Sequence, residues 1–290
     1  MTESTMTFTE KFLSLDPAKI ARAIGTTGFF AIEGALTPQF LDKIEEDVSR
    51  NRFGLNLNQV TGVFANRQYY LVDMLAVSKA FFDYCTHAAV FAISRQYLGA
   101  HFRLQSLRYY ETFGKHLMQW HTDNKTDRSF AHIPGLIFIA YASDVNDGEF
   151  QYVSGSQKWS GAKGYNDYPD DFVTDMYGKD IVSFKLPRGS VIIYDTYGIH
   201  RAKPVEDKNF VRKSLFFQVD TELNNAERII VNTAFLDKLD DETKMYLGFG
   251  LPSEYAAFPK TGLQSLPLNR DIGMPLLKWA VMAAAKNSLR

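Results

Sequence analysis

The chain has 290 residues, of which 46% are hydrophobic and 22% charged, and its formal net charge is -1. These values are ordinary for a globular protein that buries a sizeable core. Without an excess of positive charge there is no basic field to hold nucleic acid or an anionic membrane, so neither partner is expected. The single cysteine, Cys85, excludes an internal disulfide. Together with a polar N-terminal stretch that lacks an apolar signal core, it indicates a cytoplasmic protein.

The first ~100 residues are predicted to be mostly helical. A helix should begin at Asp16, a good N-cap that is followed by proline, and end near Gly25. A short strand and turn are expected over 29–36. A second capped helix should cover 37–50, and a longer, largely buried helix should cover 79–99.

From Phe102 onward the pattern changes to short aromatic or β-branched runs separated by Gly, Pro, Asn and Asp. Helices followed by a series of strands predict an α+β protein whose core is a sandwich or an open barrel. The candidate strands are 102–111, 135–143, 149–154, 180–186, 190–196 and 214–220.

No internal repeat, low-complexity tract or linker interrupts the chain, so we expect one domain over 1–290. It would consist of a helical part (~1–100), a core (~101–233) and a helical or irregular extension (~234–290). The apolar run "MPLLKWAVMAAA" in that extension is too short to span a bilayer. It predicts a helix that packs on the domain or on a second subunit, which leaves a homodimer possible.

Two histidines and an aspartate are candidate metal ligands. His121 and Asp123 lie two positions apart in "QWHTD", so on a strand they share a face. His200 follows the candidate strand 190–196 after a short loop. Two imidazoles and one carboxylate form the facial triad that binds Fe(II) and leaves coordination positions open. A hydrogen-bonded His–Asp pair without metal is the alternative interpretation.

A candidate carboxylate clamp follows. Arg212 alternates with apolar residues of a core strand, and Ser214 shares its face. A buried guanidinium and a hydroxyl can bind a distal carboxylate. Open positions on iron near such a clamp suggest 2-oxoglutarate as cosubstrate with O2 as oxidant. A surface salt bridge for Arg212 and an ordinary strand serine at 214 are the alternatives.

Five motifs, taken in their order along the chain, resemble the phytanoyl-CoA dioxygenase-like (PhyH) branch of the Fe(II)/2-oxoglutarate oxygenases. The resemblance extends from about Ala23 to Val219. The segments that carry the resemblance are "GTTGFFAIEGALTPQFLDKI", "QWHTD", "SDVNDGEFQYVSGSQKW", "LPRGSVIIYDTYGIHRA" and "RKS". Two departures fall in turns: Ser190 replaces the usual Asp, and residues 153–157 lack the usual Pro and His.

The resemblance implies a double-stranded β-helix (jelly-roll, cupin-like) core with flanking N-terminal and C-terminal helices. It also implies that His121, Asp123 and His200 bind iron, and that Arg212 and Ser214 bind 2-oxoglutarate. A polar side chain on the strand before the first iron ligand meets the C1 carboxylate of the cosubstrate in this family. That role is carried to Gln105, with Gln119 as the competing residue.

The implied function is that of an Fe(II)- and 2-oxoglutarate-dependent dioxygenase that oxidises an unactivated C–H bond of a small molecule. Related halogenases have Ala or Gly in place of Asp123, so its carboxylate favours oxygen insertion or another oxidation over chlorination. A secondary metabolite is the expected substrate, and an acyl-CoA or lipid is the alternative. A cupin-like enzyme that does not use 2-oxoglutarate and a non-catalytic binder are rival classes.

Overall fold

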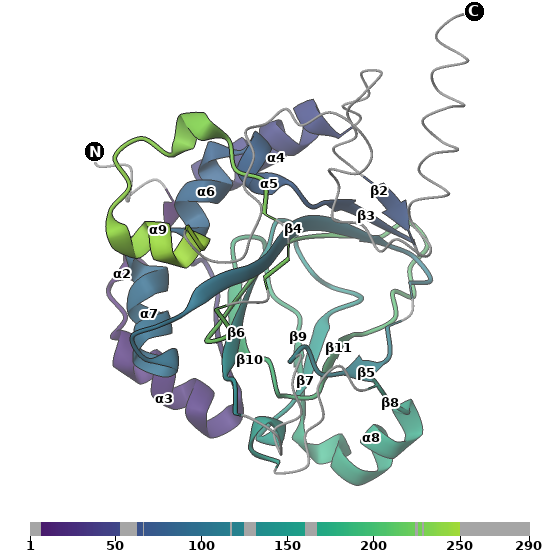
Figure 1. The fold of residues 1–290 in the computed structure, drawn as a ribbon. Helices are drawn as coiled ribbons and strands as arrows, with labels where there is room; N and C mark the ends of the chain where they lie inside the picture. Colours follow the sequence, from purple (N-terminus) through teal and green to yellow (C-terminus); the bar gives the residue numbers. More distant parts are fainter. Residues whose placement is uncertain are drawn as a thin grey trace, which may run out of the picture.

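The computed structural model describes residues 7–52, 63–65, 67–116, 118–124, 132–159, 167–223, 226–227 and 229–249. Two antiparallel β-sheets, of seven and five strands, face each other, and helices cover the outer face of the larger sheet (Figure 1). The fold is therefore α+β with a jelly-roll core, which confirms the expected class.

The first long helix begins as predicted but ends later. In α3 (Pro17–Thr27) the Asp16 side chain accepts a hydrogen bond from the backbone N–H of Ala18. The helix continues past Gly25 and ends at Gly28, whose φ of 95° is in the left-handed region. Glycine adopts this conformation without strain, so Gly28 is the residue that stops the helix.

Helix α4 (Pro38–Asn51) begins at the predicted cap, where the side chain of Thr37 accepts from the backbone N–H of Phe40. Its apolar residues recur every three or four positions and lie buried on one side. These residues are Phe40, Leu41, Ile44 and Val48.

The single long helix expected over 79–99 is in fact two helices, α6 (Lys79–Cys85) and α7 (Ala88–Leu98). The ring Nδ1 of His87 accepts from the backbone N–H of Ala89, so this residue caps α7 and starts a new helix. The remaining helices are α2 (Glu10–Leu13), α5 (Met74–Val77), α8 (Asp170–Tyr177), α9 (Asp241–Leu247) and the 3-10 turns Ser156–Lys158, Gly178–Asp180 and Thr233–Phe235.

The larger sheet contains seven strands, with β12 in the centre, and includes one pair that the sequence did not predict. Its order is β1 (Phe29–Ile32), β10 (Val191–Asp195), β6 (Gly135–Tyr141), β12 (Val211–Asp220), β4 (Arg103–Phe113), β3 (Gln68–Leu71) and β2 (Val63–Ala65). The pair β2 and β3 lies in the part expected to be helical. It is stabilised by pairing with β4, a tertiary contact that local pattern does not reveal.

The smaller sheet has the order β8 (Asp167–Tyr168), β5 (Trp120–His121), β11 (His200–Ala202), β7 (Phe150–Val153) and β9 (Ile181–Phe184). Its strands β5, β8 and β11 were not among the candidates. Two or three residues are too few for an alternating pattern to be recognised. These short strands nevertheless carry both histidines of the candidate metal site.

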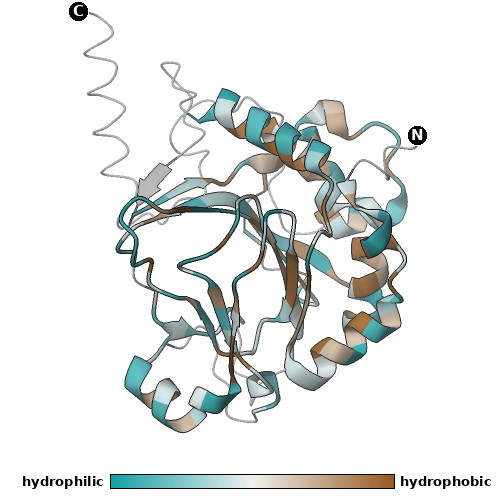
Figure 2. Cartoon of the chain, turned by 180° about the vertical axis from the view of Figure 1, so that it is seen from behind, coloured by the Kyte–Doolittle hydropathy of each residue, from teal (hydrophilic) through white to brown (hydrophobic). Residues whose placement is uncertain are grey.

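Strand β6 illustrates how the core is built. Leu136, Phe138 and Ala140 pack toward the helices, whereas Ile137, Ile139 and Tyr141 pack between the two sheets. Because both faces are buried, the strand is an uninterrupted apolar run. Figure 2 shows the apolar colour concentrated on the strands and on the sides of the helices that face them.

Helix α9 confirms that helical structure returns after Ala234. The extension beyond it, including the apolar run near the C-terminus, lies outside the described residues. Within the described part of the chain, no helix has the length and apolarity needed to cross a membrane.

Candidate metal and cosubstrate site

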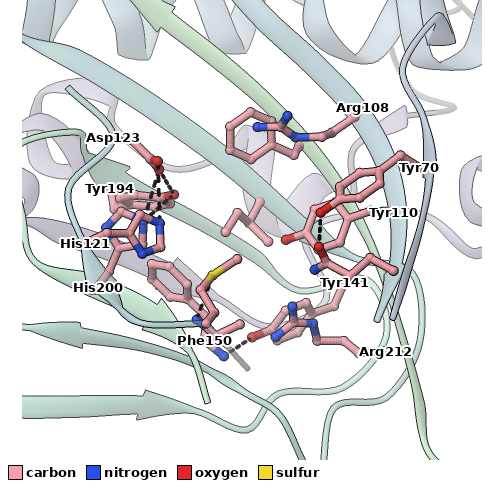
Figure 3. Close-up of a pocket in the computed structure, with 15 residues that line it drawn as sticks. Tyr70, Arg108, Tyr110, His121, Asp123, Tyr141, Phe150, Tyr194, His200 and Arg212 are labelled. Atoms are coloured by element: carbon pink, nitrogen blue, oxygen red, sulfur yellow. Dashed lines mark hydrogen bonds and ion pairs between the residues drawn. The ribbon is translucent and has the colours of Figure 1, made fainter. Parts of the chain in front are cut away.

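The three predicted metal ligands come together. One ligand atom each from His121, Asp123 and His200 can be chosen so that all three lie within 4.8 Å of one another. Nε2 of His200 is 3.0 Å from Oδ2 of Asp123, and Nε2 of His121 is 3.6 Å from Oδ1 (Figure 3). The two histidines come from the neighbouring strands β5 and β11, and Asp123 is the second residue after β5.

Backbone carbonyls orient both imidazoles. Nδ1 of His121 lies 2.8 Å from the carbonyl oxygen of Gln119, and Nδ1 of His200 lies 2.9 Å from that of Gly198. Because a carbonyl oxygen only accepts, each Nδ1 carries the proton and donates it. In the neutral ring Nε2 then has a free lone pair, and it is Nε2 that faces the other ligands.

The ionisation states also suit a divalent metal. Burial by itself raises the pKa of Asp123, but the neighbouring His200, His121 and Tyr194 outweigh it and hold that pKa well below its usual range. Burial and the nearby His200 lower the pKa of His121. An ionised carboxylate and a neutral imidazole are the forms that bind Fe(II), so these residues fit the metal.

Tyr194 is a neighbour of the triad that the sequence did not identify. Its hydroxyl donates to Oδ2 of Asp123 at 3.0 Å and lies 3.4 Å from Nε2 of His200. It comes from β10, directly before Asp195, and faces the space between the sheets. The hydroxyl therefore fixes the carboxylate that would bind the metal.

The loop between β10 and β11 joins the ligands into one unit. The backbone N–H groups of Asp123 and Asn124 both donate to the carbonyl oxygen of Thr196. On the other side, the N–H of Ile199 donates to Oγ of Ser156 at 2.8 Å. The motif residue Ser156 thus holds the strand that presents His200.

The triad forms one wall of a cavity of about 200 Å³. Arg212 lines the same cavity and is 2% exposed. It donates to the carbonyl oxygen of Gly148 and to Oγ1 of Thr112, while its Nε has no acceptor among the described residues. A buried guanidinium with a free N–H beside a metal site fits a carboxylate ligand.

Ser214 shares the face of β12 with Arg212 but is not among the residues that line the cavity. Its hydroxyl is fully buried and has no hydrogen-bond partner within the described residues. A buried hydroxyl costs free energy unless it is hydrogen-bonded. In the part of the chain described, this hydroxyl and the Nε of Arg212 are thus two free polar groups on one face of β12.

Gln105 is buried on β4 outside the cavity lining. Its side-chain nitrogen donates to the carbonyl oxygen of Glu222, so the structure does not bring it to the triad. A bulge in the pairing of β12 with β4 lies near Gln105 and shifts the alternation there. Gln119 contributes its backbone carbonyl to His121.

Other cavity residues were missed by sequence reasoning. The strand neighbour of Arg212 and Ser214 is β4, and its residues on the same face contribute to the lining. Alternation from Thr112, which pairs with Arg212, would have identified them once the two strands were known to be adjacent. These residues of β4 are Arg108 and Tyr110. The cavity is also lined by Gln68 and Tyr70 from β3 and by Met118, Ile139, Tyr141, Phe150, Ala202 and Phe216.

The fold and the site together define a jelly-roll protein with a candidate 2-His-1-carboxylate metal site. The family model described as Phytanoyl-CoA dioxygenase (PhyH) matches residues 25–213. No curated protein sequence matches the chain.

Solved structures share the fold. HygX from Streptomyces hygroscopicus with nickel and 2-oxoglutarate bound is 18% identical, with a TM-score of 0.57, and the match covers 72% of this chain and 89% of that one. The same enzyme with nickel, 2-oxoglutarate and hygromycin B bound is 17% identical (TM-score 0.57; 78% and 98% covered). The non-heme alpha ketoglutarate dependent carbocyclase SnoK from nogalamycin biosynthesis is 16% identical (TM-score 0.53; 72% and 85% covered).

Because the family model covers more than half of the chain, this protein belongs to the phytanoyl-CoA dioxygenase (PhyH) family. It is therefore an Fe(II)- and 2-oxoglutarate-dependent oxygenase, with O2 as the oxidant, as the motif order indicated.

Proposed function

We propose that this enzyme hydroxylates an unactivated C–H bond of a small molecule, with a secondary metabolite as the substrate class. The observation that carries the proposal is the convergence of His121, Asp123 and His200 on a cavity that also contains Arg212. HygX, which shares the fold, binds hygromycin B, and SnoK acts in nogalamycin biosynthesis. Those two relatives support a natural product as substrate.

In this proposal His121, Asp123 and His200 hold Fe(II), and Arg212 with Ser214 binds the distal carboxylate of 2-oxoglutarate. Bound iron and cosubstrate supply the oxidative power, since O2 activation is coupled to decarboxylation of 2-oxoglutarate to succinate and CO2. The protein itself positions the metal ligands and forms the surroundings of the reacting atoms. Tyr194 holds the carboxylate of Asp123 in place by its 3.0 Å hydrogen bond.

Apolar walls limit the access of water to the triad, although the side chains of His121 and Asp123 are 20% and 21% exposed. Ile139, Phe150 and Phe216 line the cavity with apolar surface, and the triad lies at one side of it (Figure 3). A dry site prevents side reactions of an oxidising centre. The carboxylate of Asp123 takes the ligand position that a halide needs in related halogenases, so hydroxylation is the proposed outcome.

We propose one domain over 1–290, with a cytoplasmic location supported by the single, buried cysteine. A near-neutral net charge supports a small-molecule substrate in place of nucleic acid. The apolar run at 274–285 supports a homodimer.

The test is an anaerobic titration of the apoprotein with Fe(II) and then 2-oxoglutarate, followed by visible absorption. We expect the weak metal-to-ligand charge-transfer band in wild type, its loss in His200→Ala and a higher 2-oxoglutarate requirement in Arg212→Ala. Succinate release against a panel of natural products and acyl thioesters then separates the two substrate classes. A folded, metal-loaded protein without the band would contradict the proposal.

A further inference from the structure

Arg108 is a cation in the cavity to which the reaction outlined above assigns no role. It projects from β4, opposite Phe216 on β12, and its Cζ lies 4.4 Å from the centre of that ring. Both residues line the cavity, and Figure 3 shows Arg108 across the cavity from the triad. A guanidinium over an aromatic ring keeps its N–H groups available to donate to a ligand.

This guanidinium lacks the acceptor that comparable arginines have. Among the described residues, every other arginine that is not fully surface-exposed donates to a carboxylate or a backbone carbonyl. The pairs are Arg52 with Glu111, Arg103 with Leu223, Arg188 with Asp42, Arg201 with Asp170 and Arg212 with Gly148.

Arg108 has no hydrogen bond or ion pair to any described residue. The charged groups that influence it are Glu227, which is exposed, and Asp123, which belongs to the triad. Neither carboxylate is at ion-pair distance. Arg108 is only half-buried, so its N–H groups can be reached by solvent in the free protein and by a ligand in the cavity.

Arg108 and Arg212 enter the cavity at different places. Arg212 pairs with Thr112, and Phe216 pairs with Arg108, four residues further along the same two strands. At about 3.3 Å per residue, roughly 13 Å of strand separates the two positions. Tyr110 lies between them on β4 and also lines the cavity. One arginine can therefore hold the cosubstrate while the other remains available.

We propose that Arg108 binds a carboxylate of the substrate, so that the enzyme oxidises a carboxylic acid. A planar guanidinium matches a carboxylate in two parallel hydrogen bonds, and one positive charge balances one negative charge. Apart from Gln68, Arg212 and the triad, the rest of the wall is apolar or aromatic, which suits a hydrocarbon body between the anchor and the triad. This inference rests on the proposed function, because it takes Arg212 to be occupied by 2-oxoglutarate.

The experiment measures binding, which needs no knowledge of the natural substrate. The protein is loaded with Ni(II) and saturating 2-oxoglutarate, and dissociation constants are measured calorimetrically for three acid and amide pairs. The pairs are benzoate and benzamide, hydrocinnamate and hydrocinnamamide, and octanoate and octanamide. We expect wild type to bind at least one acid about tenfold or more tightly than its amide, as a charge-assisted bidentate contact allows.

Three variants assign the preference. Arg108→Met keeps the length of the side chain and should abolish the preference for the acid, while Arg108→Lys should retain part of it. Arg95→Met removes an exposed arginine and should leave the preference unchanged. In Arg108→Met the 2-oxoglutarate affinity should stay within about twofold of wild type, since Arg212 is intact.

The results distinguish this inference from the proposed function. No acid preference in any pair, or a preference that survives in Arg108→Met, overturns the inference. So does an Arg108→Met variant whose main defect is in 2-oxoglutarate binding, because Arg108 would then serve the cosubstrate. Absence of the Fe(II)/2-oxoglutarate charge-transfer band in wild type would instead reject the proposed function itself.

Discussion

His200 lies directly opposite His121 in the antiparallel pairing of β11 with β5, and their ring centroids are 4.4 Å apart. The two residues are 79 positions apart in the sequence. Cross-strand partners have adjacent side chains, so this register brings both imidazoles to the same side of the proposed metal site. A one-residue slip would turn one of them to the other face of the sheet.

Replacing His200 should remove the metal without unfolding the protein. His200→Ala should weaken Mn(II) or Fe(II) binding by about a hundredfold or more, since even the residues that only support a ligand cost 10- to 100-fold. Anaerobic equilibrium dialysis measures this. The matched control is His101→Ala, an exposed histidine outside the cavity, which should bind metal as wild type does. Equal loss in both variants would contradict the assignment.

Ser214→Ala tests the carboxylate clamp. Loss of one hydrogen bond should raise the 2-oxoglutarate dissociation constant by about two- to tenfold. The melting temperature should not fall, because the hydroxyl has no partner among the described residues. The control is Ser190→Ala, whose hydroxyl donates to the carbonyl oxygen of Pro187 at 2.7 Å. That variant should lose about 1 kcal/mol of stability and keep its cosubstrate affinity.

The ion pair between Arg52 and Glu111 should make stability depend on pH. Glu111 is 2% exposed and accepts from Arg52 and, at 2.8 Å, from the hydroxyl of Tyr109. Burial raises the pKa of Glu111, but these donors outweigh it and lower that pKa below its ordinary 4.5. A depressed pKa stabilises the fold above pH 4.5, and this contribution is lost as pH falls through the folded-state value.

Glu111→Gln should therefore cost about 2 kcal/mol near pH 7 and less in acid, measured by urea unfolding at several pH values. The control is Glu242→Gln, which breaks the exposed pair with Arg95. Exposed pairs contribute little, so we expect a change below about 0.5 kcal/mol. A pH-independent loss in Glu111→Gln would mean that packing, and not the charge, is responsible.

Gly198→Ala tests how the loop before His200 positions the metal ligand. A Cβ at this position would lie 1.6 Å from the hydroxyl of Tyr152, so the ring or the loop must move. The carbonyl of Gly198 orients the His200 imidazole. We expect a loss of about 1–3 kcal/mol in stability and weaker metal binding.

Gly25→Ala is the matched control for this substitution. Gly25 lies inside α3, and a Cβ there meets nothing within 4 Å. Alanine should raise stability by about 0.5–1 kcal/mol and leave metal binding unchanged. Unaltered metal affinity in Gly198→Ala would show that the loop does not position His200.

Prediction from the sequence succeeded where the information was local. Strands such as β6 and β10 have unbroken apolar runs, and the cap residues Asp16 and Thr37 mark helix starts by their own hydrogen-bonding chemistry. It failed where a competing local signal, or a strand far away in the sequence, determined the secondary structure. His87 broke the long helix by capping α7, and β2 with β3 formed strands because β4 was available to pair.

By itself the sequence determined the class of this protein. The order of "QWHTD", "GIHRA" and "RKS" indicated two histidines, a carboxylate and an arginine whose chemistry suits Fe(II) and 2-oxoglutarate. Only the tertiary structure decided which other side chains share their cavity. Tyr194 is 73 positions from His121 in the chain, and Arg108, although only 13 positions away, lies in the other sheet, so their places in the cavity depend on how the two sheets pack together. Spacing along one strand gives its faces, whereas the neighbours across a cavity are set by long-range packing.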